Sequence, residues 1–430
     1  MNDTQSLSEK RNLSVLFGQG TFSTTAWTMA NPSVVLTYLA ISLELPVLLA
    51  GMLVTFGQAA CLLTAIFATP IAAQRPQKKR DLAATDIVLA VAFAVALAAA
   101  AFGTPLVVGI CFVLVILVVK ATSEYQAIIT AGFYGEVLNS QSRTLLMYSV
   151  MTLGGIVTGA LAWSAHRAFF DDPPFDRHVV LVTIGVVCFV VASAVILLVR
   201  EFEKEARQKP ASVDKTVQKF SVTAQTREAI DNLRLLIGMR WFRRYLRVRL
   251  ALLTVELSIP FYAILAALAH HTSPKGLAAL ILSSATALIV SGPLWGLAGT
   301  KSTRTVMTAG ASLAALAGAM LVANFFYPVL DSPYVHAIAL FIVTVAVRGV
   351  STARYLYFMD VAPEKYAVIG IGVSKVVVRT VGIALSFAMA AVAHLQHVIW
   401  AILALALINA VTAALTYRAA GNPETKTQPV

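Results

Sequence analysis

The sequence predicts an all-α membrane protein with twelve transmembrane helices in two pseudo-symmetric six-helix bundles, and with both termini in the cytoplasm. Three observations carry this prediction. Hydrophobic residues make up 58% of the chain and charged residues only 13%, whereas soluble domains carry about 25% charged residues. The mean hydropathy is +0.78, and apolar runs long enough to cross a bilayer follow one another along the chain. One long polar segment divides these runs into two sets of similar length.

A spanning helix needs about 20 mostly apolar residues. Runs of this kind are expected at 14–40, 45–68, 83–102, 105–135, 144–167, 178–200, 249–270, 276–299, 304–326, 334–358, 367–393 and 396–418. The first run contains Asn31-Pro32, which should kink it, as is tolerated where neighbours or water satisfy the freed backbone groups. The polar residues 1–12 show no signal-peptide pattern, so the first run is expected to be retained.

The runs divide the chain into a first bundle at 1–200, a cytoplasmic linker at 201–248 and a second bundle with a short tail at 249–430. Residues 214–219 have the composition of a flexible linker. From Thr226 onward, apolar residues fall at helical spacing among arginines, which is typical of a helix on an anionic inner leaflet; a solvated connector is the alternative. The net charge of +12 lies mostly in connections on one side, which indicates positive-inside topology rather than a nucleic-acid partner.

Nothing in the sequence points to catalysis. Cys61, Cys111 and Cys188 lie in apolar runs without disulfide or metal-site spacing. No nucleophile–His–acid set and no metal-ligand set lies at matched depth, and no Gly-x-x-x-x-Gly-Lys-Ser/Thr loop occurs. We therefore expect no catalytic residues, no metal and no cofactor, and not an enzyme.

Two apolar stretches carry charges near their middle. Residues 113–134 include Lys120 and Glu124, which fall on one helical face and can pair; residues 341–358 include Arg348 and Arg354. A charge at bilayer depth costs at least about 2.5–3.5 kcal/mol, so it normally faces a bundle interior or a water-filled path. These stretches are the main indication of function.

The two halves share features at nearly one separation, which favours an internal duplication: Arg75 with Lys301, Lys120 with Arg348, and Glu136 with Asp360. The loop after the second run holds Pro70, Gln74, Arg75, Gln77, Lys78 and Lys79, and its counterpart holds Gly296, Thr300, Lys301 and Arg304. In these loops and in the number of helices the whole chain resembles the major facilitator superfamily, whose loop signature is Gly-x-x-x-Asp-Arg-x-Gly-Arg-Arg. The basic positions are kept, while the aspartate is replaced in both loops.

The resemblance implies a secondary transporter whose first, fourth, seventh and tenth helices line a central cavity. It also implies that loop charges latch one conformation; the candidates are Arg75, Lys78, Lys301, Arg304, Glu136, Arg143 and Asp360. The fifth run contains Gly154, Gly155 and Gly159, whose small size allows close helix packing. That run lacks the proline usual in proton-linked drug exporters, which counts against a drug antiporter.

On this architecture the cavity region would hold Lys120, Glu124, Glu256, Arg348 and Arg354, joined by Lys375 and Arg379 of the eleventh helix. Basic residues outnumber acids by five to two. One Lys–Glu and one Arg–Glu pair would neutralise both acids, and an anionic substrate would satisfy the remaining cations, because the arginine fork matches carboxylate or phosphate. Candidate substrate-binding residues are Lys120, Arg348, Arg379, Arg354, Tyr125, Trp27 and Asn31. Glu124 and Glu256 are candidates for proton coupling or charge pairing.

Structural roles stay open for several of these charges. Lys120 and Glu124 could form a purely structural pair, Arg354 and Lys375 could snorkel to the inner surface, and Arg379 could hold the eleventh helix to neighbouring carbonyls. Pro260 is expected to break the seventh helix near Glu256.

The expected function is secondary transport of a small organic anion by alternating access, driven by protons or another coupling ion. The alternatives are a multidrug proton antiporter for lipophilic cations or neutral compounds, and a non-transporting receptor or assembly factor that docks partners on 201–248. The expected setting is a monomer, spanning a bacterial inner membrane several times, with an anionic inner leaflet and no nucleic-acid partner.

Overall fold

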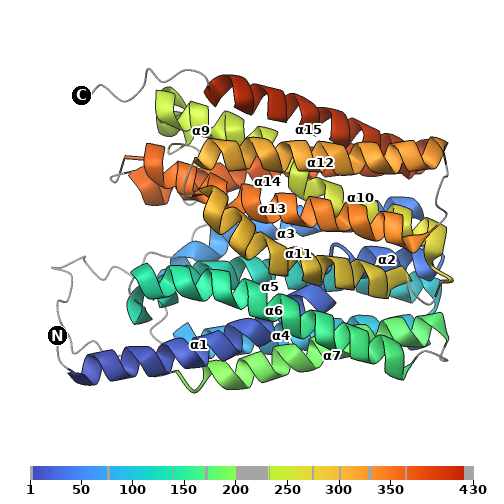
Figure 1. The fold of residues 1–430 in the computed structure, drawn as a ribbon, viewed down its shortest axis with the longest axis horizontal. Helices are drawn as coiled ribbons and strands as arrows, with labels where there is room; N and C mark the ends of the chain where they lie inside the picture. Colours follow the sequence, from blue (N-terminus) through green and yellow to red (C-terminus); the bar gives the residue numbers. More distant parts are fainter. Residues whose placement is uncertain are drawn as a thin grey trace.

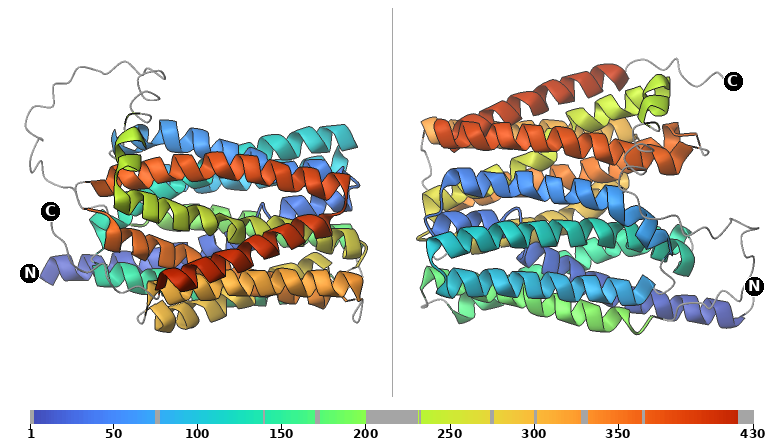
Figure 2. Two further views of the ribbon diagram at one scale, coloured as in Figure 1. Left: turned by 90° about the horizontal axis from the view of Figure 1, so that it is seen from above. Right: turned by 180° about the vertical axis from the view of Figure 1, so that it is seen from behind.

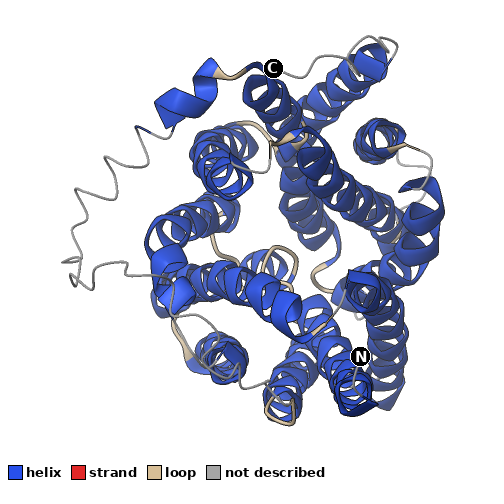
Figure 3. Cartoon of the chain, turned by 90° about the vertical axis from the view of Figure 1, so that its left-hand side faces the viewer, coloured by secondary structure: helices blue, strands red, loops and turns tan. Residues whose placement is uncertain are grey.

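The computed structural model describes residues 3–74, 78–138, 140–169, 173–199, 231, 233–273, 276–299, 302–327, 332–363 and 366–420. This part of the chain is helical, with short connections and no strand (Figures 1 and 3). The helices are α1 (Asp3–Met29), α2 (Val35–Ser42), α3 (Val47–Gln74), α4 (Lys78–Phe102), α5 (Pro105–Val137), α6 (Ser140–Ala168), α7 (Pro174–Ile196), α9 (Arg240–Ala251), α10 (Leu253–His270), α11 (Gly276–Gly299), α12 (Thr303–Phe326), α13 (Pro333–Val361), α14 (Ala367–Leu395) and α15 (Val398–Ala420).

Within the described residues, eleven helices are long and apolar enough to cross a membrane, rather than the twelve expected. The difference lies in the first run, 14–40. There α1 ends at Met29 and α2 begins at Val35, so the expected kink at Asn31-Pro32 is a complete interruption. The Asn31 side-chain oxygen accepts a hydrogen bond from the backbone nitrogen of Ser33 at 3.0 Å, and proline has no backbone donor to continue a helix.

The helices form two sets that lie one above the other in Figure 1. The N-terminal set is α1–α7 and the C-terminal set is α9–α15. The sets meet where α3 packs against α14, where α6 packs against α11 and where α2 packs against α10. The start of α1 and the end of α15 lie at the same end of the bundle (Figure 2). We call this the termini end and the opposite side the far end.

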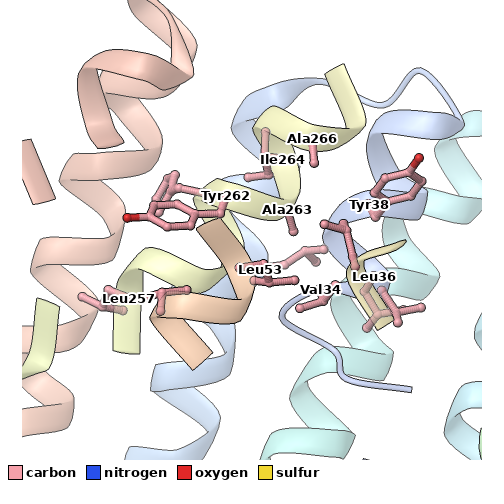
Figure 4. Packing of buried hydrophobic residues seen from close by; sticks show 14 of the residues in the cluster. Val34, Leu36, Tyr38, Leu53, Leu257, Tyr262, Ala263, Ile264 and Ala266 are labelled. Atoms are coloured by element: carbon pink, nitrogen blue, oxygen red, sulfur yellow. The ribbon is translucent and has the colours of Figure 1, made fainter. Parts of the chain in front are cut away.

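At the far end, α2 packs against α10 and so joins the two sets; Figure 4 shows buried side chains of this region, among them Tyr38, Ala263 and Ile264. The Tyr38 hydroxyl donates a hydrogen bond to the backbone oxygen of His270 at 3.0 Å, and its ring is fully buried. Val34 and Leu36 belong to the same buried cluster as Ala263 and Ile264 of α10. This seal is apolar, so its stability comes from packing and one buried hydrogen bond.

The expected basic amphipathic helix is described only in its second half. Residues 214–219 and 226–230 lie outside the described residues, and α9 begins at Arg240. Phe242 and Tyr245 on α9 are buried, whereas Arg243 and Arg247 are exposed. Since only Leu252 lies between α9 and α10, the seventh expected run begins earlier than residue 249.

The expectation that Pro260 breaks the seventh helix is wrong, because α10 runs through Pro260 without interruption. A neighbouring helix supports the preceding turns. Asn409 of α15 accepts a hydrogen bond from Thr254 at 2.6 Å and donates one to Ser258 at 3.4 Å. Proline inside a spanning helix is tolerated where neighbours of this kind compensate for it.

Two glycines of α6 stand at close helix contacts, one with the other set and one within the N-terminal set. A Cβ on Gly155 would lie 2.7 Å from the backbone oxygen of Ala285 on α11, and one on Gly154 would lie 2.6 Å from the Thr24 side chain on α1. An added Cβ on Gly159 meets nothing within 4 Å. Two of the three glycines that the sequence marked for packing therefore stand where a neighbouring helix leaves no space.

Replacing Gly155 by alanine is expected to lower the melting temperature, because the new methyl group must push α6 and α11 apart. Overpacking of this kind costs about 1–3 kcal/mol. Thermal unfolding of the detergent-purified protein measures the effect, and Gly159→Ala is the matched control. Equal melting temperatures for Gly155→Ala and the unsubstituted protein would contradict the tight α6–α11 contact.

Candidate functional site: a charged central cavity

A cavity of about 490 Å³ lies between the two sets and is lined by side chains of α1, α2, α3, α5, α10, α11, α13 and α14. Seven of the nine expected binding and coupling residues line it: Trp27, Asn31, Lys120, Glu124, Glu256, Arg348 and Arg379. The structure thus brings together residues that are more than 300 positions apart in the chain. The spacing of charges within apolar runs was enough to find most of them.

Glu124 is the centre of an ion-pair network that joins the two sets. Lys375 of α14 donates to its Oε1 at 2.6 Å, and Arg379 of α14 donates to its Oε2 at 3.1 Å. Arg379 also donates to the side-chain oxygen of Gln58 on α3 at 2.7 Å. Glu124 is only 6% exposed, so two cations compensate a carboxylate that has little access to water.

The structure therefore does not contain the pair of Lys120 with Glu124 that the sequence left open. Both residues are on α5, but the Glu124 carboxylate accepts charge-assisted hydrogen bonds from Lys375 and Arg379 of α14. Lys120 instead lies 3.5 Å from the hydroxyl of Ser33. Its aliphatic stem passes Gly57 on α3, where an added Cβ would stand 3.0 Å from the lysine Cγ. Gly57 thus makes room for this lysine.

Glu256 has a partner within its own set. Arg354 of α13 donates to its Oε1 at 3.0 Å, and the Ser351 hydroxyl lies 3.3 Å from the same oxygen. The side chains of Arg354 and Glu256 are 17% and 28% exposed, so the pair borders the cavity rather than lying deep in the core. Arg354 does not line the cavity; it acts as the partner of a residue that does.

Arg348 differs from the other cavity charges, because its guanidinium group has no partner among the described residues. It lies on α13, lines the cavity and is exposed. Within the described part of the chain, its guanidinium group makes no hydrogen bond and no ion pair; only its backbone oxygen is engaged, by the Thr352 hydroxyl at 3.1 Å. Lys120 likewise has no carboxylate partner among the described residues. The cavity therefore presents two basic groups that form no ion pair with a described carboxylate.

The remaining expected residues lie elsewhere. Tyr125 does not line the cavity; its hydroxyl lies 3.4 Å from a carboxylate oxygen of Asp81 on α4. Arg304 lines a separate pocket of about 280 Å³ together with Arg244 and Arg247 of α9.

Lys78 begins α4, and Asp360 is exposed near the end of α13. Of the other latch candidates, Arg75 and Lys301 lie outside the described residues, and the side chains of Glu136 and Arg143 are not described.

Two polar residues inside the bundle were missed by sequence reasoning. Gln58 binds Arg379 in the cavity wall, and Asp86 lies fully buried on α4. Gln58 could have been found as a polar residue in the middle of an apolar run. Asp86 is near the start of its run, where a carboxylate is commonly taken for a surface residue. Lys375 was considered in the sequence, but a position close to the helix start did not reveal its contact with Glu124.

The fold and cavity are those of a membrane transporter, and comparison with known proteins identifies the family. A sequence model of the Major Facilitator Superfamily matches residues 15–387, so the chain belongs to this family. The chain is a multi-pass membrane transporter rather than an enzyme, which confirms the resemblance inferred from the loop motifs. No curated protein sequence matches the chain.

Solved structures with the same fold include three transporters of different kinds. A POT family transporter in complex with 5-aminolevulinic acid has a TM-score of 0.67 at 12% identity, covering 95% of this chain and 96% of that chain. The inward-open xylose transporter XylE from E. coli has a TM-score of 0.66 at 9% identity, covering 97% of both. The nucleoside transporter NupG has a TM-score of 0.65 at 12% identity, covering 95% and 98%. At these identities the similarity establishes the fold alone.

The Glu124 network can be tested with a double-mutant cycle. Glu124→Gln is expected to destabilise the protein more than Glu124→Gln combined with Lys375→Gln, because the single change leaves both cations without their carboxylate. The coupling should be about 0.5–3 kcal/mol, as for residues in direct contact, measured from unfolding in a denaturant titration. Pairing Glu124→Gln with Arg243→Ala, on the exposed side of α9, should give additive effects. Additivity in both cycles would contradict the ion pair.

Proposed function

We propose that this transporter moves a small organic anion across the membrane by alternating access. The observation that carries the proposal is the pairing pattern of the cavity charges. Glu124 and Glu256 each contact basic side chains, whereas Arg348 and Lys120 reach the cavity with no carboxylate partner among the described residues. The positive charge that is left over thus faces the space that a substrate would occupy.

The energetic argument follows from the depth of these groups. An ionised group away from bulk water is stable only when an opposite charge, hydrogen bonds or local water compensate it. A bound carboxylate or phosphate would supply that charge. Arg348 offers a planar fork suited to bidentate contact, and Lys120 offers a compact ammonium with three donors. Trp27 and Asn31 in the same wall would contact the remainder of the substrate.

Alternating access is supported by a difference between the two ends of the bundle. The sets meet through apolar packing at one end and through ion pairs nearer the other. The far end is closed by the apolar contact of α2 with α10, while nearer the termini end the sets are tied by the ion pairs of Glu124 with α14. Arg379 belongs both to this tie and to the cavity wall. An anion that draws Arg379 toward itself would weaken its bond to Glu124 and so couple binding to rocking of the sets.

A multidrug exporter for lipophilic cations is the less favoured alternative. Such a protein would offer its carboxylates to the ligand and keep its basic residues paired. The cavity has the reverse arrangement, because both carboxylates are already engaged and two basic groups are not.

The proposed setting is a monomer in a bacterial inner membrane, with the termini end in the cytoplasm. Lys78, Lys79 and Arg80 at the start of α4 and the exposed arginines of α9 all lie toward the termini end, as positive-inside topology requires. The same arginines would contact anionic lipids of the inner leaflet.

The anion proposal is tested by thermal-shift titration of the detergent-purified protein with organic anions, lipophilic cations and neutral sugars. Stabilisation by one anion class is expected, and Arg348→Ala should weaken the apparent affinity about 10- to 100-fold, since a hydrogen bond to a charged group contributes about 1.5–3 kcal/mol. Arg348→Lys should be intermediate. Arg243→Ala, which removes an arginine outside the cavity, is the control.

Stabilisation by lipophilic cations that is unaffected by Arg348→Ala would overturn the anion proposal in favour of the exporter. It would also assign Arg348 a structural role.

We further propose that protons drive transport through Glu124 or Glu256. Glu124→Gln and Glu256→Gln are each expected to abolish uptake driven by a pH gradient in proteoliposomes while leaving substrate exchange intact, because exchange requires no net proton movement. Radiolabelled anion uptake with and without the gradient measures both activities. Unchanged pH dependence in both variants would rule out these two carboxylates as coupling groups.

A further inference from the structure

Asp86 is a buried acid that the cavity does not include. It lies on α4, eight residues after the helix begins at Lys78, which places it about 12 Å along the helix from the termini end. The residue is 0% exposed and does not line the central cavity. A carboxyl group in a spanning helix with no access to water calls for a physical explanation.

The groups around Asp86 are amides and hydroxyls rather than cations. The Gln126 amide of α5 donates to Oδ1 at 2.7 Å, and Gln19 of α1, itself only 7% exposed, lies beside the same carboxyl. Tyr134 of α5 also faces it. On α7, the Ser193 hydroxyl donates its hydrogen bond to the backbone oxygen of Ala83. Among the described residues, no lysine, arginine or histidine pairs with Asp86, and Oδ2 has no hydrogen-bond partner.

This environment contrasts with that of the other two intramembrane acids. Glu124 is bound by two cations and Glu256 by one. An ionised carboxylate buried without a cation is strongly disfavoured, and the usual outcome is that the group takes up a proton. Gln126 donates to one carboxyl oxygen, and a proton on the other oxygen would give that oxygen a hydrogen bond to donate to the Gln19 amide oxygen.

We propose that Asp86 is a proton-carrying site of the transport cycle, protonated in this conformation and deprotonated when α5 moves relative to α4. The inference deepens the proposed proton-driven transport and rests on it for its role in the cycle. In the release step the O–H bond of the carboxyl breaks. The proton passes to a water molecule entering from the termini end, and the electron pair stays on Asp86 as a carboxylate.

The link to the substrate runs along α5. This helix carries Glu124 in the cavity wall and, two residues later, Gln126 at Asp86. In this conformation Glu124 ties α5 to α14 through Lys375 and Arg379. Opening of these ion pairs frees α5 to shift, which displaces Gln126 from Asp86 and admits water to the carboxyl. Unlike Glu124 and Glu256, Asp86 can exchange its proton without an ion pair of its own being broken.

The first test needs no substrate. Infrared spectroscopy of the purified protein near neutral pH should show the C=O stretch of a protonated carboxyl, absent from Asp86→Asn. The stretch should remain in Asp176→Asn, which removes an exposed aspartate at the far end. The band should also weaken in Glu124→Gln, because the severed ion pairs release α5. No band in the unsubstituted protein would overturn protonation of Asp86, and a band unaffected by Glu124→Gln would overturn the link through α5.

The second test measures transport in proteoliposomes. Asp86→Asn keeps the shape of the protonated side chain, so anion exchange should stay within about twofold of the unsubstituted protein. Accumulation driven by a pH gradient should fall to the equilibration level. Accumulation equal to that of the unsubstituted protein would overturn the coupling role and make the proton a structural one. Failure of the unsubstituted protein to bind or move any anion would instead overturn the proposed function, and the infrared result would still decide whether Asp86 holds a proton.

Discussion

The structure depends on the compensation of charged side chains that have little access to water. Glu124 is the clearest case. Its carboxylate is almost fully buried and is held by Lys375 and Arg379 from the other helix set. Removing one partner of a buried pair leaves an uncompensated charge, which is far more costly than the net gain from forming the pair. The network is therefore better understood as a constraint on which conformations are allowed than as a source of stability. Arg379, which also binds Gln58, extends the constraint to α3.

The two helix sets are held in contact by different interactions at the two ends of the bundle. At the far end, Tyr38 and the apolar residues around it hold the sets together by packing and one hydrogen bond. By contrast, α14 contacts α5 through ion pairs. Along the sides, small residues let backbones approach, as Gly155 does against α11. Apolar contacts of this kind are indifferent to pH and substrate charge, but ion pairs respond to both. The contacts that respond to pH and substrate charge thus include Arg379 in the cavity wall.

Sequence reasoning found the class of fold and most of the cavity, because apolar runs and the charges within them are local patterns. Lys120, Arg348 and Arg379 were recognised by their depth in such runs and do line the cavity. Pairing could not be predicted in this way. The sequence offered Lys120, four residues away, as a partner for Glu124, because helical spacing gives near neighbours and carries no information about α14, some 250 residues later. Asp86 and Gln58 were missed for a related reason, since their importance comes from residues on other helices.

The junction between α9 and α10 has a mechanical consequence. Only Leu252 separates the two helices, and its backbone is itself helical. Phe242 and Tyr245 fasten α9 to the helix bundle through buried rings, so α9 and α10 form a bent lever rather than a hinge. Glu256 and its contact with Arg354 lie just past the bend. A change in the bilayer that lifts or tilts α9, such as altered thickness or curvature, would then turn the wall of the cavity and adjust the carrier to the physical state of its membrane.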